Sequence, residues 1–400
     1  MRINSIKLIP IKLHLKEPFI IASVTNDEMF YVIVKVTTDN GLVGYGEAIP
    51  AWEVTGETQF SVIDVINHLC EPQKTGMSLI GQDISSLEQI ENLFSLIAGW
   101  HSTAIIAGAP SARAALQGAV LDAFGKYVKK PIYEFFNGKK RPILVNRVIS
   151  IFPVQQTLER VRDEIKRSSK TIKLKIGIKD FDSMNNFERD VKVVREAKKL
   201  IDATDSGIKL VADANQGFVD EEQAIAFCKR VEGCLDWLEQ PILAENKRGF
   251  KKIKESCSIK LMADESVHSF YDAKLLIDAK AVDYINLKIM KCGGLFEVLR
   301  IAEYAAENNV PCQIGSMLDG LIGCAFSAQT HLSHANIFSA EIATFSRLTE
   351  KLGKGIELAG NEIKLSNKPG LGVEIDDKDI ESYRIMHEDS LTYRSLLSER

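Results

Sequence analysis

The 400-residue chain has no large excess of charge of either sign. Its 50 Lys and Arg are balanced by 54 Asp and Glu, for a formal net charge of −4. Without a basic surplus to neutralise phosphates, we expect no nucleic-acid partner. No run approaches the ~18 apolar residues that span a bilayer, and the N-terminus has no apolar signal core. These absences predict a cytoplasmic protein that does not act at a membrane.

Several motifs that would indicate other classes of protein are also missing. The seven Cys residues include no C-x-x-C pair, which argues against a disulfide framework and a zinc site. Neither a P-loop nor the G-x-S-x-G motif of serine hydrolases occurs. The glycines of residues 41–46 have the wrong spacing for a dinucleotide-binding loop, and we interpret them as hairpin glycines. The remaining composition, 45% hydrophobic and 26% charged, is that of an ordinary globular protein.

The first third of the chain predicts an α+β domain. Residues 2–15, 30–38 and 42–47 are rich in β-branched residues and predict an antiparallel sheet, with a turn at 39–41. Helices are expected at 59–70, 85–97 and 111–127, and the small residues of the last would permit close packing. We assign residues 1–135 to this domain.

From residue 143, short apolar strands alternate with amphipathic helices. Strands are expected at 171–176, 208–212, 237–238, 259–262, 284–287 and 311–314, and helices among others at 220–232, 269–279 and 295–308. The repeat of about 25 residues allows seven or eight units between 143 and 360, which favours a (β/α)₈-type barrel over an open sheet. The polar tail, residues 361–400, is predicted to pack on the first domain.

Three acidic residues end successive predicted strands. Asp213, Glu239 and Asp264 are separated by one βα repeat each. Because the carboxyl ends of barrel strands meet at one mouth, we expect these side chains to converge. Converging carboxylates repel one another unless a cation neutralises them, and an all-oxygen ligand set suits Mg²⁺. The spacing therefore predicts a magnesium site.

Lysines flank the three acids. Lys173 and Lys175 share one face of the preceding strand, because they are two residues apart. Lys288 ends the strand that follows Asp264, one repeat further along. A single such residue would be interpreted as a surface charge, but charges in register at successive strand ends would be costly to bury without a function. We expect a lysine on each side of a metal-bound substrate.

These motifs, in this order, resemble the enolase superfamily in its muconate-lactonizing-enzyme subgroup. The motifs are Lys173-Leu174-Lys175-Ile176-Gly177, Asp213-Ala214-Asn215-Gln216, Leu238-Glu239-Gln240-Pro241, Ala263-Asp264-Glu265-Ser266, Ile285-Asn286-Leu287-Lys288, Lys291-Cys292-Gly293-Gly294 and Gly370-Leu371-Gly372. The resemblance covers nearly the whole chain. It implies an α/β fold, a modified TIM (β/α) barrel, with an α+β capping domain formed by the first domain and the tail.

The resemblance also implies roles for individual residues. Mg²⁺ would lie on the three acids, Lys175 and Lys288 would be the acid/base pair, and Lys173 would assist in charge stabilisation. Asn215 and Glu265 would lie behind these groups. The protein would be an isomerase that removes the α-proton of a small carboxylate substrate via an enediolate, and the family suggests a homo-oligomer. No His occurs at 311–316, which argues against the mandelate-racemase and sugar-acid-dehydratase subgroups.

Two activities remain open. Residues 47–58, with Thr55, resemble the substrate-covering loop of dipeptide epimerases, but those enzymes carry Asp-x-Asp where this chain has Ser339-Ala340-Glu341. Residues 315–323, with Asp319, and the later Glu341 resemble the muconate cycloisomerases. We predict a racemase or epimerase of a dipeptide or N-acyl amino acid, with a muconate-type cycloisomerase as the alternative. Thr55, Asp319 and Glu341 are the candidate substrate contacts. A non-catalytic binding protein is a remote alternative, because every charged position is present.

Overall fold

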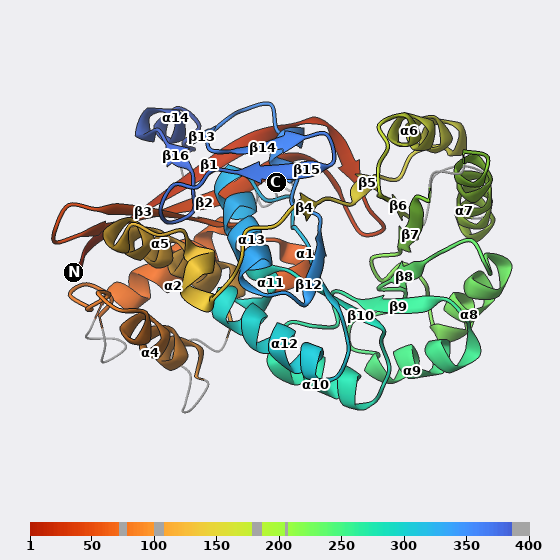
Figure 1. Ribbon diagram of the computed structural model, residues 1–400, viewed down its shortest axis with the longest axis horizontal. Coiled ribbons are helices and arrows are strands. Elements are labelled where there is room, and N and C mark those ends of the chain that lie inside the picture. Colours follow the sequence, from red (N-terminus) through yellow and green to blue (C-terminus); the bar gives the residue numbers. More distant parts are fainter. Residues whose placement is uncertain (72–77, 100–107, 178–185, 205–206, 386–400) are drawn as a thin grey trace, which may run out of the picture.

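The computed structural model describes residues 1–71, 78–99, 108–177, 186–204 and 207–385. An antiparallel sheet with its helices occupies one side of the molecule, and a curled parallel sheet with its helices occupies the other (Figure 1). Among the described helices, none is both long enough and apolar enough to cross a membrane.

The N-terminal sheet consists of three antiparallel strands: β1 (Ile3–Ile20), β2 (Thr25–Thr38) and β3 (Val43–Ala48). The helices of this region are α1 (Trp52–Thr55), α2 (Gln59–Cys70), α4 (Leu87–Ala98) and α5 (Pro110–Val128), followed by the 3₁₀ helix η1 (Ile132–Phe136). The predicted α+β arrangement is confirmed. The β1–β2 hairpin is longer than predicted, because both strands continue to the turn at residues 21–24.

Helix α5 packs directly on β3. A Cβ atom on Gly44 would lie 1.9 Å from the carbonyl oxygen of Ala119, and one on Gly46 would lie 1.8 Å from that of Ala115. Only glycine leaves room for this contact. The glycines at 44 and 46 thus belong to a strand under a helix, in agreement with a hairpin rather than a cofactor loop.

From residue 147 to residue 340 the chain forms eight parallel strands in sequence order. They are β5 (Arg147–Ile149), β6 (Thr171–Lys175), β7 (Lys209–Asp213), β8 (Trp237–Glu239), β9 (Lys260–Ala263), β10 (Tyr284–Leu287), β11 (Cys312–Ile314) and β12 (Ile337–Ala340). A parallel bridge between Val145 and Ala340 joins the two edges of this sheet. The predicted barrel is confirmed.

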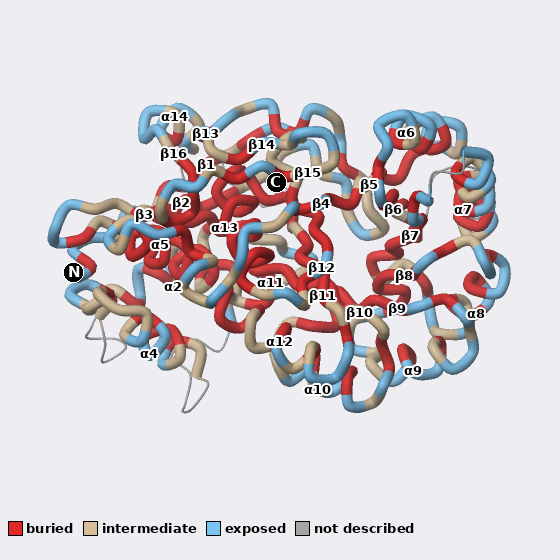
Figure 2. Tube along the Cα trace, viewed as in Figure 1, coloured by how far each residue is buried: buried red, intermediate tan, exposed pale blue. Residues whose placement is uncertain are grey.

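Helices cover the outside of the barrel strands. They are α6 (Val154–Lys166), α7 (Asn186–Asp202), α8 (Glu221–Arg230), α9 (Lys247–Ser256), α10 (Phe270–Asp278), α12 (Leu295–Glu307) and α13 (Leu321–Ser333), with the short α11 (Ile289–Cys292) after β10. The strands between them are almost wholly buried (Figure 2). Parallel strands covered by helices in this way are rich in apolar residues, and β6 differs in carrying Lys173 and Lys175.

After β12 the chain leaves the barrel. The 3₁₀ helix η2 (Thr344–Arg347) is followed by short strands and a final helix: β13 (Gly353–Lys354), β14 (Ile356–Ala359), β15 (Glu362–Leu365), β16 (Glu374–Ile375) and α14 (Asp377–Ser382). Strand β15 pairs with β14 and with β4 (Ile143–Leu144). The backbone N–H of Leu371 donates to Asp122 of α5 at 2.9 Å, and Lys35 of β2 forms an ion pair with Asp377. The part of the predicted tail from 386 to 400 lies outside the described residues.

The tip of the β1–β2 hairpin reaches the barrel. The backbone N–H of Ile20 donates to Ser150 Oγ at 2.5 Å, and the N–H of Ile151 donates to the carbonyl of Ile20 at 3.0 Å. Glu17 accepts two hydrogen bonds from Arg160 of α6, at 2.9 and 2.7 Å. The antiparallel sheet therefore projects a hairpin beside the first barrel strand, where it helps to enclose the mouth of the barrel.

Candidate active site

The three predicted metal ligands come together at the carboxyl ends of neighbouring strands. In the parallel pairing of β7 with β8, Asp213 lies opposite Glu239, and Asp264 directly follows β9. Carboxylate oxygens of the three residues lie within 4.8 Å of one another. Each side chain is at most 1% exposed. The regular βα spacing thus produces a compact buried cluster of oxygens.

Lysines lie on both sides of this cluster. Lys175 Nζ is 2.6 Å from Asp213 Oδ2, and Lys288 Nζ is 2.6 Å from Asp264 Oδ2. Because β7, β8 and β9 separate β6 from β10, the two lysines approach the cluster from opposite ends of the row of strands. The third lysine, Lys173, is fully buried and donates to Glu239 Oε2 at 2.5 Å.

Burial and charge act in opposite directions on two of these lysines. Burial disfavours the ammonium form of Lys173, but carboxylates including Glu239 and Glu341 outweigh it, so the pKa of Lys173 is raised. Burial likewise opposes the charged form of Lys288, and Asp264 outweighs it and raises the pKa of Lys288. In the absence of another cation, therefore, both side chains remain protonated near neutral pH.

The pKa values of the acids in the cluster are shifted in different directions. Burial tends to raise the pKa of Asp264, but Lys288 and Lys291 hold it far below its usual value. The pKa of Glu239, in contrast, is raised well above its usual range by burial, and Asp213 and Asp264 add to that effect against the opposing charge of Lys173. The Glu239 carboxylate therefore has too little positive charge around it. A divalent cation among these oxygens would supply that charge, so the donor set fits Mg²⁺.

Asn215 and Glu265 lie next to the lysines, as the resemblance implies. Lys175 Nζ donates to Asn215 Oδ1 at 2.9 Å, and Asn215 Nδ2 donates to Glu265 Oε1 at 3.0 Å. Burial and the charge of Asp264 raise the pKa of Glu265 to about 7. The chain of contacts holds the Lys175 ammonium in one orientation.

Three polar residues that support the cluster had no role in the sequence analysis. Asn286 Nδ2 donates to Glu239 Oε1 at 2.7 Å, Lys291 Nζ donates to Asp264 Oδ1 at 2.8 Å, and Gln240 Oε1 accepts from the backbone N–H of Asp264 at 2.9 Å. Asn286 lies two residues before Lys288, so the same-face argument that linked Lys173 to Lys175 would have identified it. No comparable periodicity marks Lys291, which lies on α11.

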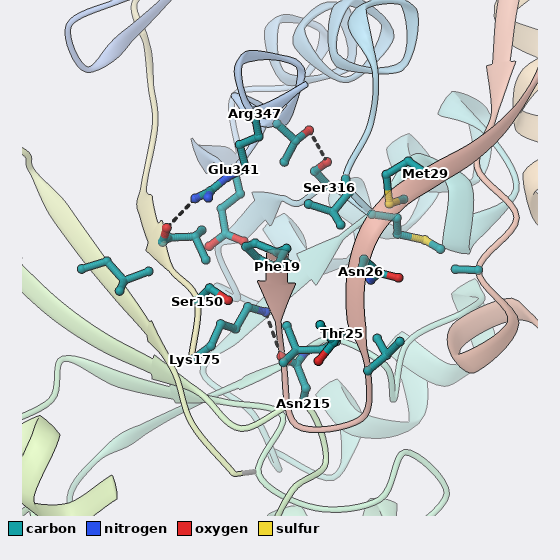
Figure 3. Close-up of a pocket in the computed structure, with 18 of the residues that line it drawn as sticks. Phe19, Thr25, Asn26, Met29, Ser150, Lys175, Asn215, Ser316, Glu341 and Arg347 are labelled. Atoms are coloured by element: carbon teal, nitrogen blue, oxygen red, sulfur yellow. Dashed lines mark hydrogen bonds between the residues drawn. The ribbon is translucent and has the colours of Figure 1, made fainter. Parts of the chain in front are cut away.

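A cavity of about 1170 Å³ opens above the cluster. Lys175, Asn215 and Glu341 point into it from the barrel, and Phe19 and Thr25 of the β1–β2 hairpin lie on the facing side (Figure 3). Lys288 and Glu265 also line it. Its volume lies above the ~300–1,000 Å³ typical of small-molecule sites, and exceeds what a bare amino acid needs.

The three predicted substrate contacts lie in different environments. Glu341 lines the cavity, but its carboxylate forms an ion pair with Lys173. Thr55 is not among the residues that line the cavity, and its hydroxyl donates to the carbonyl of Ala51 at 3.2 Å. Asp319 is 2% exposed and accepts the backbone N–H of Met317 at 2.9 Å, inside the loop after β11. The structure thus brings only Glu341 of these three to the cavity.

Comparisons with known proteins agree on one family. The family model described as enolase C-terminal domain-like matches residues 156–380, and that of the mandelate racemase / muconate lactonizing enzyme N-terminal domain matches residues 4–136. An N-succinyl-L-Arg/Lys racemase of Bacillus cereus is 28% identical over 390 residues, which cover 97% of this chain and 99% of that protein.

Two solved structures represent the two activities left open by the sequence. The dipeptide epimerase from Enterococcus faecalis, complexed with Mg and the dipeptide L-Leu-L-Tyr, aligns with a TM-score of 0.82 at 28% identity, over 94% of this chain and all of that one. The muconate lactonizing enzyme from Pseudomonas fluorescens, complexed with muconolactone, aligns with a TM-score of 0.86 at 27% identity, over 96% of this chain and 99% of that one. Overall shape alone therefore does not separate the two.

Proposed function

Since the chain belongs to the mandelate racemase and muconate lactonizing enzyme family of the enolase superfamily, and is an isomerase of that superfamily, we propose that it is a Mg²⁺-dependent racemase or epimerase of an N-acylated amino acid. The N-acyl group is either a second amino acid, as in a dipeptide, or a simple acyl chain. The observation that carries this proposal is the pair Lys175 and Lys288. They line one cavity and approach the acid cluster from opposite ends.

Two lysines on opposite faces of one carbon can invert its configuration. One lysine accepts the α-proton from one face, and the other, protonated, donates a proton to the opposite face. Asn215 orients the Lys175 ammonium through its 2.9 Å hydrogen bond. Lys173 is fully buried against Glu239 and Glu341 and, unlike Lys175 and Lys288, is not among the residues that line the cavity, so it balances negative charge rather than accepting a proton from the substrate. A Mg²⁺ ion held by Asp213, Glu239 and Asp264 would neutralise the charge that develops on the substrate carboxylate.

The partners of Glu341 favour a simple acyl chain over the second amino acid of a dipeptide, which would carry a free ammonium group. Where dipeptide epimerases carry two acids, this chain has Glu341 alone, and its carboxylate is engaged by Lys173. A substrate ammonium group at this end of the cavity would have to compete with that buried ion pair. A simple acyl chain carries no ammonium group and needs no such partner.

The test is α-proton exchange in D₂O with Mg²⁺ present. N-acyl amino acids and dipeptides of both configurations would be screened by mass spectrometry, and muconate-type diacids by loss of their conjugated absorbance. We expect a mass increase of one unit together with formation of the opposite configuration. Loss of muconate absorbance without exchange in any amino-acid derivative would instead identify a cycloisomerase. The Lys175→Ala/Lys288→Ala double variant is the control, because it retains the metal ligands but has neither base.

A further inference from the structure

One cationic side chain of the cavity, that of Arg347, forms no ion pair with any of the residues that the structure describes. Arg347 ends η2, a few residues beyond the last barrel strand, and lines the same cavity as Lys175 and Lys288. Its Nη2 donates to the carbonyl of Val148 at 2.5 Å. Its Nε and Nη1 have no hydrogen-bond partner within the described ranges.

The other arginines that line the cavity each form an ion pair with a carboxylate. Arg160 forms its two hydrogen bonds with Glu17, and Arg147 Nε donates to Glu164 Oε2 at 3.0 Å. The second oxygen of Glu164 accepts from Arg167 at 2.6 Å. The nearby carboxylates are therefore already engaged, which leaves the Arg347 guanidinium with unused donors.

The position of Arg347 is well defined. Its guanidinium carbon lies 5.1 Å from the centre of the Phe19 ring, at the hairpin tip that docks on the barrel. The preceding residue is also held, since Lys16 donates to the carbonyl of Ser346 at 2.7 Å. Arg347 is half-buried, and burial lowers its pKa, which reflects a partly desolvated charge. Such a charge binds an anion more strongly than one in open water, because the local dielectric is lower.

We propose that Arg347 binds a second carboxylate of the substrate, remote from the carbon between Lys175 and Lys288. The planar guanidinium carries five N–H donors, and the bond to Val148 uses only one of its nitrogens, so the others are available for a carboxylate. The large cavity has room for a substrate extended in this direction. This inference rests on the proposed function, and it assigns specificity to a residue outside the acid cluster and its lysines.

The second carboxylate can belong to either part of an N-acyl amino acid. It can end the acyl chain, as in an N-succinyl group, or the amino-acid side chain, as in glutamate. Two pairs of compounds separate these sources across a panel of amino acids. The first pair is the N-succinyl against the N-butanoyl derivative of the same amino acid, and the second is N-butanoyl glutamate against N-butanoyl glutamine. Within each pair, only the remote charge differs substantially.

The experiment compares kcat/KM for α-proton exchange in the wild type, Arg347→Met and Arg347→Lys. We expect the wild type to prefer the charged member of one pair, and Arg347→Met to lose about 10- to 100-fold on that member only, as for a charge-assisted hydrogen bond. Arg347→Met keeps an apolar stem over Phe19, and Arg347→Lys should retain part of the preference. Arg167→Met is the matched control, because it removes the same charge from the same wall and should leave the preference unchanged.

The outcomes separate this inference from the proposed function. Activity with no preference in either pair, or a preference that survives Arg347→Met, overturns the role of Arg347 and leaves the proposed function intact. If no compound exchanges its α-proton, the proposed function fails. Calorimetric binding of the same pairs to the Mg²⁺-loaded protein then decides the inference: tighter binding of a charged member that Arg347→Met abolishes supports it, and equal binding overturns it.

Discussion

Replacing Glu47 by Gln should make the protein's stability less sensitive to pH. Glu47 belongs to β3 and is 1% exposed, at the junction between the antiparallel sheet and the barrel. Its Oε1 accepts the backbone N–H of Gly320, at the start of α13, at 2.7 Å. Its Oε2 is buried with no hydrogen-bond partner in the part of the chain that the structure describes. Burial raises the pKa of Glu47 from 4.5 to about 8, and the charge of Asp319 makes a smaller contribution in the same direction.

The sign and size of the effect follow from that shift. Because the folded pKa is raised, the folded protein keeps its proton between pH 4.5 and about 8 while the unfolded chain loses it. The stabilisation is complete below pH 4.5 and is lost as the pH rises through about 8. At about 1.4 kcal/mol per pKa unit, the loss across this window is about 5 kcal/mol. Gln cannot titrate, so Glu47→Gln lacks this component.

The assay is urea unfolding followed by tryptophan fluorescence, in chelator, at one-unit steps across this window. The free energy of unfolding of the wild type should fall relative to Glu47→Gln by about 1.4 kcal/mol per pH unit. The buried amide of Gln adds a cost that does not depend on pH, so the slope is the readout. Glu134→Gln, at an exposed position, should parallel the wild type. Parallel curves for the wild type and Glu47→Gln would refute the reasoning, because Glu47 would then ionise normally in the fold.

Three further predictions concern the site and its support. Chelation should abolish turnover, and added Mg²⁺ should restore it. Glu239→Gln should weaken Mg²⁺ binding in calorimetry, while its circular dichroism spectrum stays unchanged. Full activity in a chelated, metal-free sample would contradict the metal site. Lys175→Ala and Lys288→Ala should each lower kcat by about 10²- to 10⁴-fold. Each single variant should still exchange the α-proton of one enantiomer, the one facing the remaining lysine, and exchange of both enantiomers by a single variant would exclude the two-base scheme. Gly46→Ala should destabilise the fold by about 3 kcal/mol or more in thermal unfolding, because its Cβ would lie 1.8 Å from the Ala115 carbonyl oxygen. Gly108→Ala, which meets no atom within 4 Å, is the control, and equal melting temperatures for the two variants would contradict the packing argument.

Regular repetition made the barrel and the acid cluster predictable. In a parallel βα repeat, every strand ends at the same mouth, so a constant spacing between acids becomes spatial proximity. The spacing of Asp213, Glu239 and Asp264 was therefore enough to expect the convergence that the structure contains. The motifs around them were enough to identify the family, which the family models confirm over most of the chain.

Residues outside the repeat were harder to place. Thr55 and Asp319 were expected at the substrate because they lie in loops that resemble substrate loops, yet neither lines the cavity. A loop residue's direction depends on its own backbone hydrogen bonds, as in the bond from Thr55 to Ala51, and no periodicity encodes these. Glu341 does reach the cavity, but its pairing with Lys173 joins residues from the two ends of the barrel sequence.

The sequence by itself determined the class of fold, the family, the three acids and the lysines beside them, because local periodicity and the geometry of parallel strands act over one repeat at a time. Only the tertiary structure decided which charges remain without a partner. Arg347 differs from Arg160 not in sequence pattern but in forming no ion pair with a described carboxylate, since docking of the β1–β2 hairpin brings Glu17 to Arg160 and Phe19 to Arg347. Pairing of charges depends on contacts between segments far apart in the chain, and these contacts exist only once the β1–β2 hairpin has packed on the barrel.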